Sequence, residues 1–149
     1  MRTFYIFKIN NEYYKLTKNM PENLYNTYLN IKISTKNNID LLYNEFFSFT
    51  ESINKNVLSN LIYNKMKDYD GYSIYKNIHS FNNYYTDEVS KLMIFNSFMI
   101  LKSNIPNPTF FTILSAIPNL FIIDFEKEDY FYLSSIRNLR SLNNHKYSV

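Results

Sequence analysis

Four acidic side chains gather near the carboxyl end of the chain, where an apolar run gives way to charges. Asp124 follows residues 120–123, and Glu126, Glu128 and Asp129 come soon after it. Paired carboxylates can act as general acid and base when they converge in a pocket that shifts their pKa values. A charged turn between two strands is solvated instead, so we interpret residues 126–129 as a surface turn. Asp124 is either a partly buried base or, in the structural interpretation we favour, an acceptor of hydrogen bonds at a strand end.

Other residues that could carry chemistry do not form a recognisable motif. His79, Asp87 and Glu88 could bind a metal, but their spacing matches no ligand pattern, so we interpret His79 as a surface or packing residue. The chain has no cysteine, and its two histidines are far apart in the sequence. Its single glycine, Gly71, cannot supply a glycine-rich phosphate loop. We therefore expect no catalytic residue, no cofactor and no metal.

Paired aromatic residues are the remaining group with a potential function. They occur at Tyr13 and Tyr14, Phe46 and Phe47, and Tyr84 and Tyr85, each beside polar neighbours. Adjacent residues of a helix or strand do not share a face, so at least one ring of each pair should point outward. Rigid exposed rings suit a docking patch for another protein. The alternative is that core packing and AT-rich coding bias explain them, because 15 Tyr and 13 Phe accompany many Asn, Lys and Ile.

Length and charge limit the classes of function. A chain of 149 residues fits one domain that buries roughly 70% of its unfolded surface. Its net charge of +3 is mild and its basic residues are spread along the chain, so direct nucleic-acid binding is not favoured as the main role. The first residues do not resemble a signal peptide, and no apolar run is long enough to span a membrane. We expect a cytoplasmic protein.

The strands that would position these residues are predicted from short apolar runs. Residues 120–123 form a continuous β-branched and aromatic run, typical of a buried central strand, and residues 130–133 form its return strand. Residues 3–9 alternate aromatic and aliphatic side chains and predict the first strand. Residues 91–95 and 98–102 flank a two-residue turn and favour a hairpin, although one helix over the same stretch is the alternative.

Helical spacing and capping residues predict the rest. Helices are expected from Pro21 to about residue 31, over residues 38–49, from Asn54 or Asn56 to about residue 67, and over residues 109–116. Residues 12–16 fit either a hairpin return, which we favour, or a helical turn. The predicted fold is α+β: a single domain over residues 1–134, with a mixed or antiparallel sheet packed against about four helices. Residues 135–149 lose periodicity and predict a loosely ordered tail.

Three stretches of the sequence resemble the sporulation inhibitor of replication (SirA) family. They are TFYIFKINNEYYKLT (residues 3–17), NNYYTDEVSKLMI (residues 82–94) and NLFIIDFEKEDYFYL (residues 119–133). The resemblance covers nearly the whole chain and is carried by aromatic and aliphatic positions. It implies a small cytoplasmic α+β protein without enzymatic activity, which binds the N-terminal domain of the replication initiator DnaA and represses initiation at the chromosomal origin.

The resemblance also implies which residues bind this partner. In the family, an aromatic residue just after the first strand and residues of a following helix contact the initiator. The corresponding partner-binding residues here are Tyr13, Tyr14, Thr17, Tyr43, Phe46 and Phe47. A polar contact expected in the helix has no clear counterpart. The alternatives are a single-stranded nucleic-acid binder that stacks Tyr and Phe rings, another small protein-interaction module, or an enzyme that uses Asp124.

Overall fold

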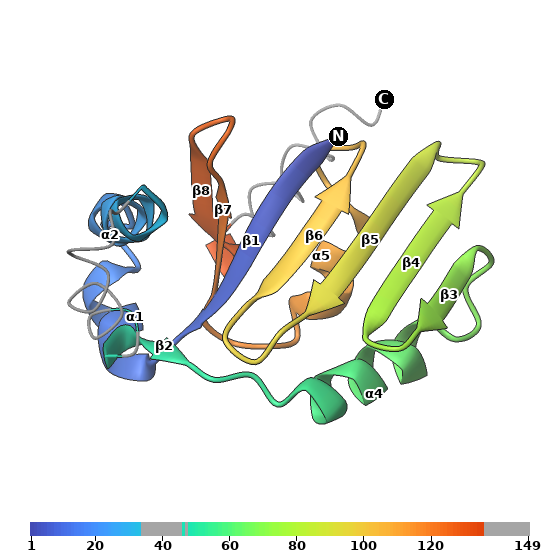
Figure 1. Ribbon diagram of the computed structural model, residues 1–149, viewed down its shortest axis with the longest axis horizontal. Helices are drawn as coiled ribbons and strands as arrows, with labels where there is room; N and C mark the ends of the chain where they lie inside the picture. Colours follow the sequence, from blue (N-terminus) through green and yellow to red (C-terminus); the bar gives the residue numbers. More distant parts are fainter. Residues whose placement is uncertain (34–45, 47, 136–149) are drawn as a thin grey trace.

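A single antiparallel sheet of eight strands organises the protein in the computed structural model, which describes residues 1–33, 46 and 48–135 (Figure 1). The strands are β1 (Arg2–Ile9), β2 (Thr50–Glu51), β3 (Tyr72–Tyr75), β4 (Ile78–Asn83), β5 (Glu88–Ile94), β6 (Met99–Ser103), β7 (Leu120–Asp124) and β8 (Asp129–Tyr132), and the helices are α1 (Asn11–Thr17), α2 (Glu22–Lys32), α4 (Lys55–Met66) and α5 (Thr109–Leu114). Their order in the sheet is β3-β4-β5-β6-β1-β7-β8, and β2 pairs with the end of β1.

The expected fold class is wrong in its balance of sheet and helix. We predicted an α+β domain with about four helices, whereas the described residues form a sheet-dominated structure with short helices. Of the helices described, α2 has 11 residues and α4 has 12, while α1 and α5 have 7 and 6. A hairpin strand needs only a few residues, so the strands between residues 72 and 103 give weaker periodic signals than the helices do.

Strand β1 connects the two halves of the sheet. One of its edges pairs with β7 from Tyr5 to Lys8, and the other pairs with β6 from Arg2 to Ile6. Strand β2 pairs with Lys8 and Ile9, beyond the last residue of β1 that pairs with β6. The first strand predicted over residues 3–9 is confirmed, and its alternating pattern places apolar side chains on both faces of the sheet.

The sheet buries a separate hydrophobic cluster on each face. Phe4 and Ile6 point toward α4 and α5, where the cluster includes Ile62, Met66 and Phe110. We call this side the helix-covered face. Phe7 and Ile9 point to the opposite side, where rings and aliphatic groups from β1, α2, β7, β8 and the residues just before β2 form what we call the aromatic core. Its buried members are Phe7, Ile9, Leu24, Tyr25, Tyr28, Phe46, Phe49, Phe121, Ile123 and Tyr132.

Several local predictions can be compared with this arrangement. Residues 120–123 lie in β7, which is buried along its length and flanked by β1 and β8, and residues 91–102 form the predicted hairpin of β5 and β6. Residues 12–16 are helical rather than a hairpin return, because the Asn10 side chain accepts a hydrogen bond from the Tyr13 amide and caps α1. The predicted helix over residues 38–49 lies mostly outside the described residues, as does the predicted tail beyond Ser135.

Helices α2 and α4 begin near the predicted residues. The Asn54 side chain accepts a hydrogen bond from the Val57 amide, which confirms Asn54 as the N-cap of α4. Val57, however, is 62% exposed and not part of the core. Helix α2 follows Pro21, and no side chain caps its first turn. Gly71 adopts a φ of 90°, and a Cβ at this position would lie 2.0 Å from the Asn82 carbonyl oxygen, so only glycine fits this turn.

A buried carboxylate joins β5 to the start of α5. Glu88 is 2% exposed, and its side chain accepts hydrogen bonds from the Thr109 amide, the Thr109 hydroxyl and the Ser90 hydroxyl. Helix α5 begins after Pro108, which has no side chain able to cap it. A carboxylate is well suited to the exposed amides of a helix N-terminus, so Glu88 replaces the missing local cap.

We expect Glu88→Ala to lower the free energy of unfolding by about 3 kcal/mol, because the Thr109 and Ser90 donors would lose a charged acceptor inside the protein. Glu126→Ala removes a carboxylate from an exposed turn and should change the free energy by less than about 0.5 kcal/mol. Urea denaturation followed by circular dichroism measures both. Equal stability of the two variants would show that Glu88 does not hold α5.

Candidate functional site

Helix α1 presents two of the predicted aromatic residues without burying either. Tyr13 and Tyr14 are both half-buried, and α1 contains no buried residue. The Tyr13 ring lies 5.5 Å from the Phe49 ring, and the Tyr14 ring meets the Tyr132 ring edge-on at 4.9 Å. Each tyrosine therefore rests one side on the aromatic core and keeps part of its surface open.

Thr17 is held by two hydrogen bonds at the end of α1. Its hydroxyl donates to the Tyr13 carbonyl oxygen at 2.6 Å and lies 2.7 Å from the Tyr132 hydroxyl. Because the Thr17 proton is already used, the Tyr132 hydroxyl donates to Thr17. Burial raises the pKa of Tyr132, which keeps that proton in place. These bonds fix the position of α1 against β8.

A shallow pocket brings two of the predicted residues together. Its volume is about 190 Å³, and it opens between α1, α2 and the segment before β2. Tyr13 and Thr17 line it, together with Asn23, Leu24, Thr27, Ser48 and Phe49. The pocket can accept an apolar side chain from a partner, while the Thr17 and Thr27 side chains supply polar atoms at its wall.

Two exposed apolar side chains lie close in sequence to Tyr13 and Thr17, which line this pocket. Leu16 is 74% exposed on α1 and Met20 is 64% exposed in the turn that follows. Leu16 is three residues after Tyr13, so both lie on the same side of the helix. We call Tyr13, Leu16, Thr17 and Met20 the α1 surface. Sequence reasoning missed Leu16 and Met20, although their helical spacing would have indicated them had residues 12–16 been predicted as a helix.

The other predicted partner-binding residues are placed differently. Phe46 is 8% exposed and packs edge-on against Phe7, at 6.0 Å, in the aromatic core. Tyr43 and Phe47 lie outside the described residues. Tyr84 and Tyr85 are 93% and 98% exposed in the turn between β4 and β5, so this pair points outward as expected. The structure thus brings Tyr13 and Thr17 together, with Tyr14 beside them and Phe46 inside.

Two of the carboxylates near residue 124, those of Asp124 and Asp129, form ion pairs with Arg2. Asp124 is 1% exposed, and its side chain accepts hydrogen bonds from the Arg2 Nε at 2.8 Å and the Lys127 amide at 3.1 Å. Arg2 also reaches Asp129 at 3.2 Å. These contacts tie the start of β1 to the turn between β7 and β8. The prediction that Asp124 accepts hydrogen bonds at a strand end is confirmed, and both of its oxygens are used.

His79 and Glu88 do not share a site. His79 is completely buried on the helix-covered face, where its Nε2 lies 2.9 Å from the Ser59 hydroxyl and its Nδ1 lies 2.7 Å from the Tyr72 hydroxyl. Glu88 caps α5 instead. Within residues 1–33, 46 and 48–135, no group of three or more His, Asp or Glu side chains is arranged to hold a metal ion. His79 is therefore a packing residue.

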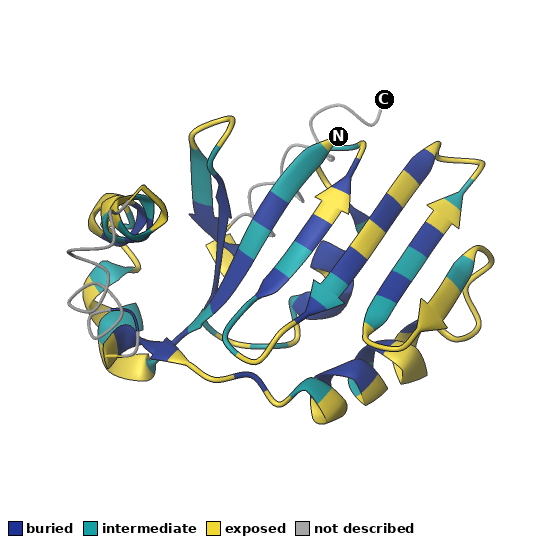
Figure 2. Ribbon diagram, in the orientation of Figure 1, coloured by how far each residue is buried: buried dark blue, intermediate teal, exposed yellow. Residues whose placement is uncertain are grey.

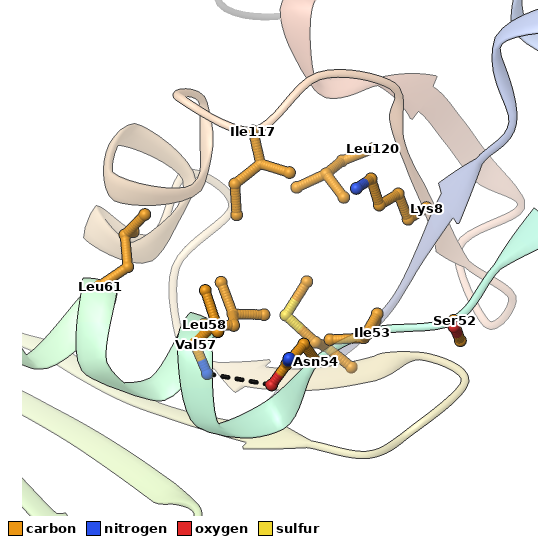
Figure 3. Close-up of a pocket in the computed structure, with 10 residues that line it drawn as sticks. Lys8, Ser52, Ile53, Asn54, Val57, Leu58, Leu61, Ile117 and Leu120 are labelled. Atoms are coloured by element: carbon orange, nitrogen blue, oxygen red, sulfur yellow. Dashed lines mark hydrogen bonds between the residues drawn. The ribbon is translucent and has the colours of Figure 1, made fainter.

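A second pocket lies between α4 and the sheet (Figure 3). It has a volume of about 180 Å³ and is lined mainly by apolar side chains, among them Leu58, Met99 and Leu120. Lys8 is its one charged lining residue, and its ammonium lies 3.4 Å from the Glu51 carboxylate. Lys8 is the one titratable side chain among the described residues that line the pocket, and it is paired with Glu51.

No family model matches this chain, and no curated protein matches its sequence significantly. Among the helices that the structure describes, none has the length and apolar character needed to cross a membrane. The geometry of the α1 surface and the resemblance noted in the sequence are therefore the grounds on which a function can be proposed.

The buried imidazole makes stability depend on pH in a specific window. Burial lowers the pKa of His79 from 6.5 to about 4. Between these values the unfolded chain binds a proton that the folded protein does not. The contribution of neutral His79 to the free energy of unfolding is therefore fully present above pH 6.5 and is lost as the pH falls toward 4. We expect His79 to account for a loss of at most about 3 kcal/mol across this window.

The variant His79→Gln isolates this effect, because it keeps a hydrogen-bonding side chain that does not titrate. Urea denaturation at several pH values should show a shallower pH dependence for the variant than for the parent between pH 4 and 6.5. The carboxylates are common to both proteins and cancel in the comparison. Parallel curves would contradict the burial of a neutral His79.

Proposed function

We propose that this chain is a non-enzymatic regulator that binds the N-terminal domain of the initiator DnaA and inhibits the initiation of DNA replication. The partner comes from the resemblance to the sporulation inhibitor of replication family. The observation that supports this site is that Tyr13 and Thr17, two positions matched by the resemblance, line one pocket beside exposed Leu16 and Met20. The proposal places the protein in the cytoplasm, where the initiator acts, and involves no cofactor or metal.

The α1 surface has the character of an interface centre. Exposed leucine and methionine side chains supply apolar area, and the half-buried Tyr13 ring combines a large apolar body with a polar tip. The contact with Phe49 and the cap from Asn10 hold the ring and its helix in place before binding. Such preorganisation reduces the entropy lost on association, so more of the contact energy contributes to affinity.

The use of the buried polar groups supports a binding role over an enzymatic one. Asp124 is paired with Arg2, Glu88 caps α5, and both nitrogens of His79 have partners. These three buried groups are therefore engaged in the fold, away from the pocket beside α1, while Glu126 and Glu128 lie in an exposed turn. A catalytic acid or base would instead need a free position facing a substrate.

Inhibition would follow from occupancy alone. An interface of standard size buries about 1,600 Å² in total, which is enough to cover a contact surface on a small initiator domain. A bound regulator would then prevent the initiator from assembling through that surface. This mechanism needs no conformational change in the regulator, and it depends on a few well-packed anchors at the centre of the interface.

We expect the double variant Tyr13→Ala/Leu16→Ala to bind the initiator domain at least 30-fold more weakly, because truncating a central anchor costs about 2 kcal/mol or more. Isothermal titration calorimetry with the purified N-terminal domain of DnaA measures the change. The matched control is Tyr84→Ala/Tyr85→Ala, which removes two exposed rings from the turn between β4 and β5 and should leave the affinity unchanged.

Three results are informative. Loss of affinity in the α1 variant alone supports the proposed surface. If only the Tyr84 and Tyr85 variant loses affinity, the partner is kept and the site is wrong. If the parent protein does not bind the domain at all, the proposed function is wrong. All the truncated side chains are exposed or half-buried, so we expect both variants to fold. Circular dichroism spectra of both variants test whether unfolding causes any loss of affinity.

A further inference from the structure

The sheet has a second, open surface on the side opposite α4 and α5. Along β5, buried Ser90, Leu92 and Ile94 alternate with Val89, Lys91 and Met93, which are exposed or half-buried (Figure 2). Strands β4 and β6 alternate in the same way. Helices α1 and α2 gather at the β7 and β8 end of the sheet (Figure 1), so they leave this side of β3 to β6 uncovered in the described structure. We call it the open face.

The strand register arranges the open face into two rows. In one row Ile78, Met93, Ile100 and Tyr5 are successive partners across β4, β5, β6 and β1. All four are half-buried, and together they span roughly 14 Å at a strand spacing of about 4.8 Å. These four side chains form a continuous apolar row that planar groups could contact.

The second row carries positive charge without compensation. Lys91 and Lys102 are direct partners on β5 and β6, and both are exposed. Like charges placed opposite each other destabilise a sheet. Their neighbours in the row, Ser80 and Thr3, are uncharged, and the described residues of this face on β3 to β6 include no Asp or Glu. Within the described residues, neither ammonium group has a carboxylate partner on this face, so both can bind an anion.

An aromatic groove continues the apolar row past Tyr5. Its volume is about 370 Å³, and it lies between β1, the end of α2 and the turn between β5 and β6. Tyr5 stacks on Phe98 at 6.2 Å and meets Phe125 at 5.4 Å. The Lys32 ammonium lies 4.4 Å from the centre of the Phe125 ring and 5.9 Å from that of Tyr5. The groove thus combines ring faces with a third cation.

We propose that the open face binds single-stranded nucleic acid. Bases would stack in the groove on Tyr5 and Phe98, and phosphates would contact Lys32, Lys102 and Lys91. Proteins bind single strands with aromatic rings and cations placed at intervals, because each base offers a flat face and each phosphate a negative charge. Here the rings are half-buried. A duplex hides its base faces, so it would not stack on these rings.

This surface is separate from the one proposed for the initiator. The open face and the adjoining aromatic groove use residues of β1, β5 and β6 together with Lys32. The α1 surface uses residues 13–20. Each proposal can therefore fail alone, and each has its own variants. A protein that carried both surfaces could hold the initiator and an unpaired strand at the same time.

The charge test uses fluorescence anisotropy with a labelled 15-nucleotide oligothymidylate at low salt. We expect salt-sensitive binding that Lys91→Glu/Lys102→Glu weakens at least tenfold, and a slope of log affinity against log salt that is smaller by about 1.4 when two phosphate contacts are lost. The control, Lys65→Glu/Lys67→Glu, makes the same charge change on the exposed side of α4 and should lose less than about threefold.

The stacking test uses Tyr5→Leu, which keeps an apolar side chain on β1 and removes the ring. We expect about tenfold weaker binding with little change in the salt slope. Tyr63→Leu on α4 is the matched control, since Tyr63 is 45% exposed on the other side of the molecule, and it should bind as the parent does. Thermal melting of each variant establishes that it is folded.

Several results would overturn the proposal. One is absence of oligonucleotide binding at low salt, and another is equal loss in the two lysine variants, which would mean that net charge alone attracts the strand. Tighter binding to a duplex of the same length would contradict the stacking role. Binding to anionic phosphatidylserine vesicles or to a polyglutamate peptide, with none to the oligonucleotide, would assign the lysines to a different class of partner.

Discussion

Strand β1 is the constraint on which the rest of the structure depends. Its backbone pairs on both edges, and its side chains pack on both faces. A strand in that position needs apolar groups at successive residues, which is what residues 4–7 provide with Phe4, Tyr5, Ile6 and Phe7. Because neighbouring side chains point to opposite faces, this short run separates the protein into a helix-covered face and an aromatic core. Both proposed surfaces border the second of these.

Buried polar groups hold the elements that surround β1. The Arg2 and Asp124 pair fixes the start of β1 to β7, Glu88 fixes α5 to β5, and His79 joins β4 to α4 and β3. An unpaired polar group in the interior would cost several kilocalories per mole, so each of these contacts also selects one arrangement of the chain. The same contacts occupy Asp124, Glu88 and His79, the buried groups that the sequence offered for catalysis or metal binding.

Local signals in the sequence predicted β1, β5, β6, β7 and β8, but neither the sheet-dominated fold nor the long-range contacts. The buried run before Asp124, the hairpin of β5 and β6 and the Asn54 cap depend on neighbours in the sequence, and all three are seen. Asn10 was ambiguous, because an Asn-Asn pair suits both a turn and a helix cap. The Arg2 partner of Asp124 is 122 residues away, and no pattern within one sequence indicates such a pairing. Phe46 belongs to an aromatic pair that was predicted to contact a partner, but its side chain is part of the core.

The aromatic residues show why composition alone could not settle function. Rings such as Phe7, Tyr28 and Phe121 are buried, and the hydroxyl of Tyr28 bonds to Thr50, so these rings follow from the need to fill the aromatic core. Packing in the core explains such positions. Tyr13 and Tyr5 differ because each rests on that core with one side and borders a pocket with the other. A ring that is supported on one side and partly open on the other loses little entropy on binding, so these two positions, and not the aromatic content as a whole, are the physical basis of the two proposals.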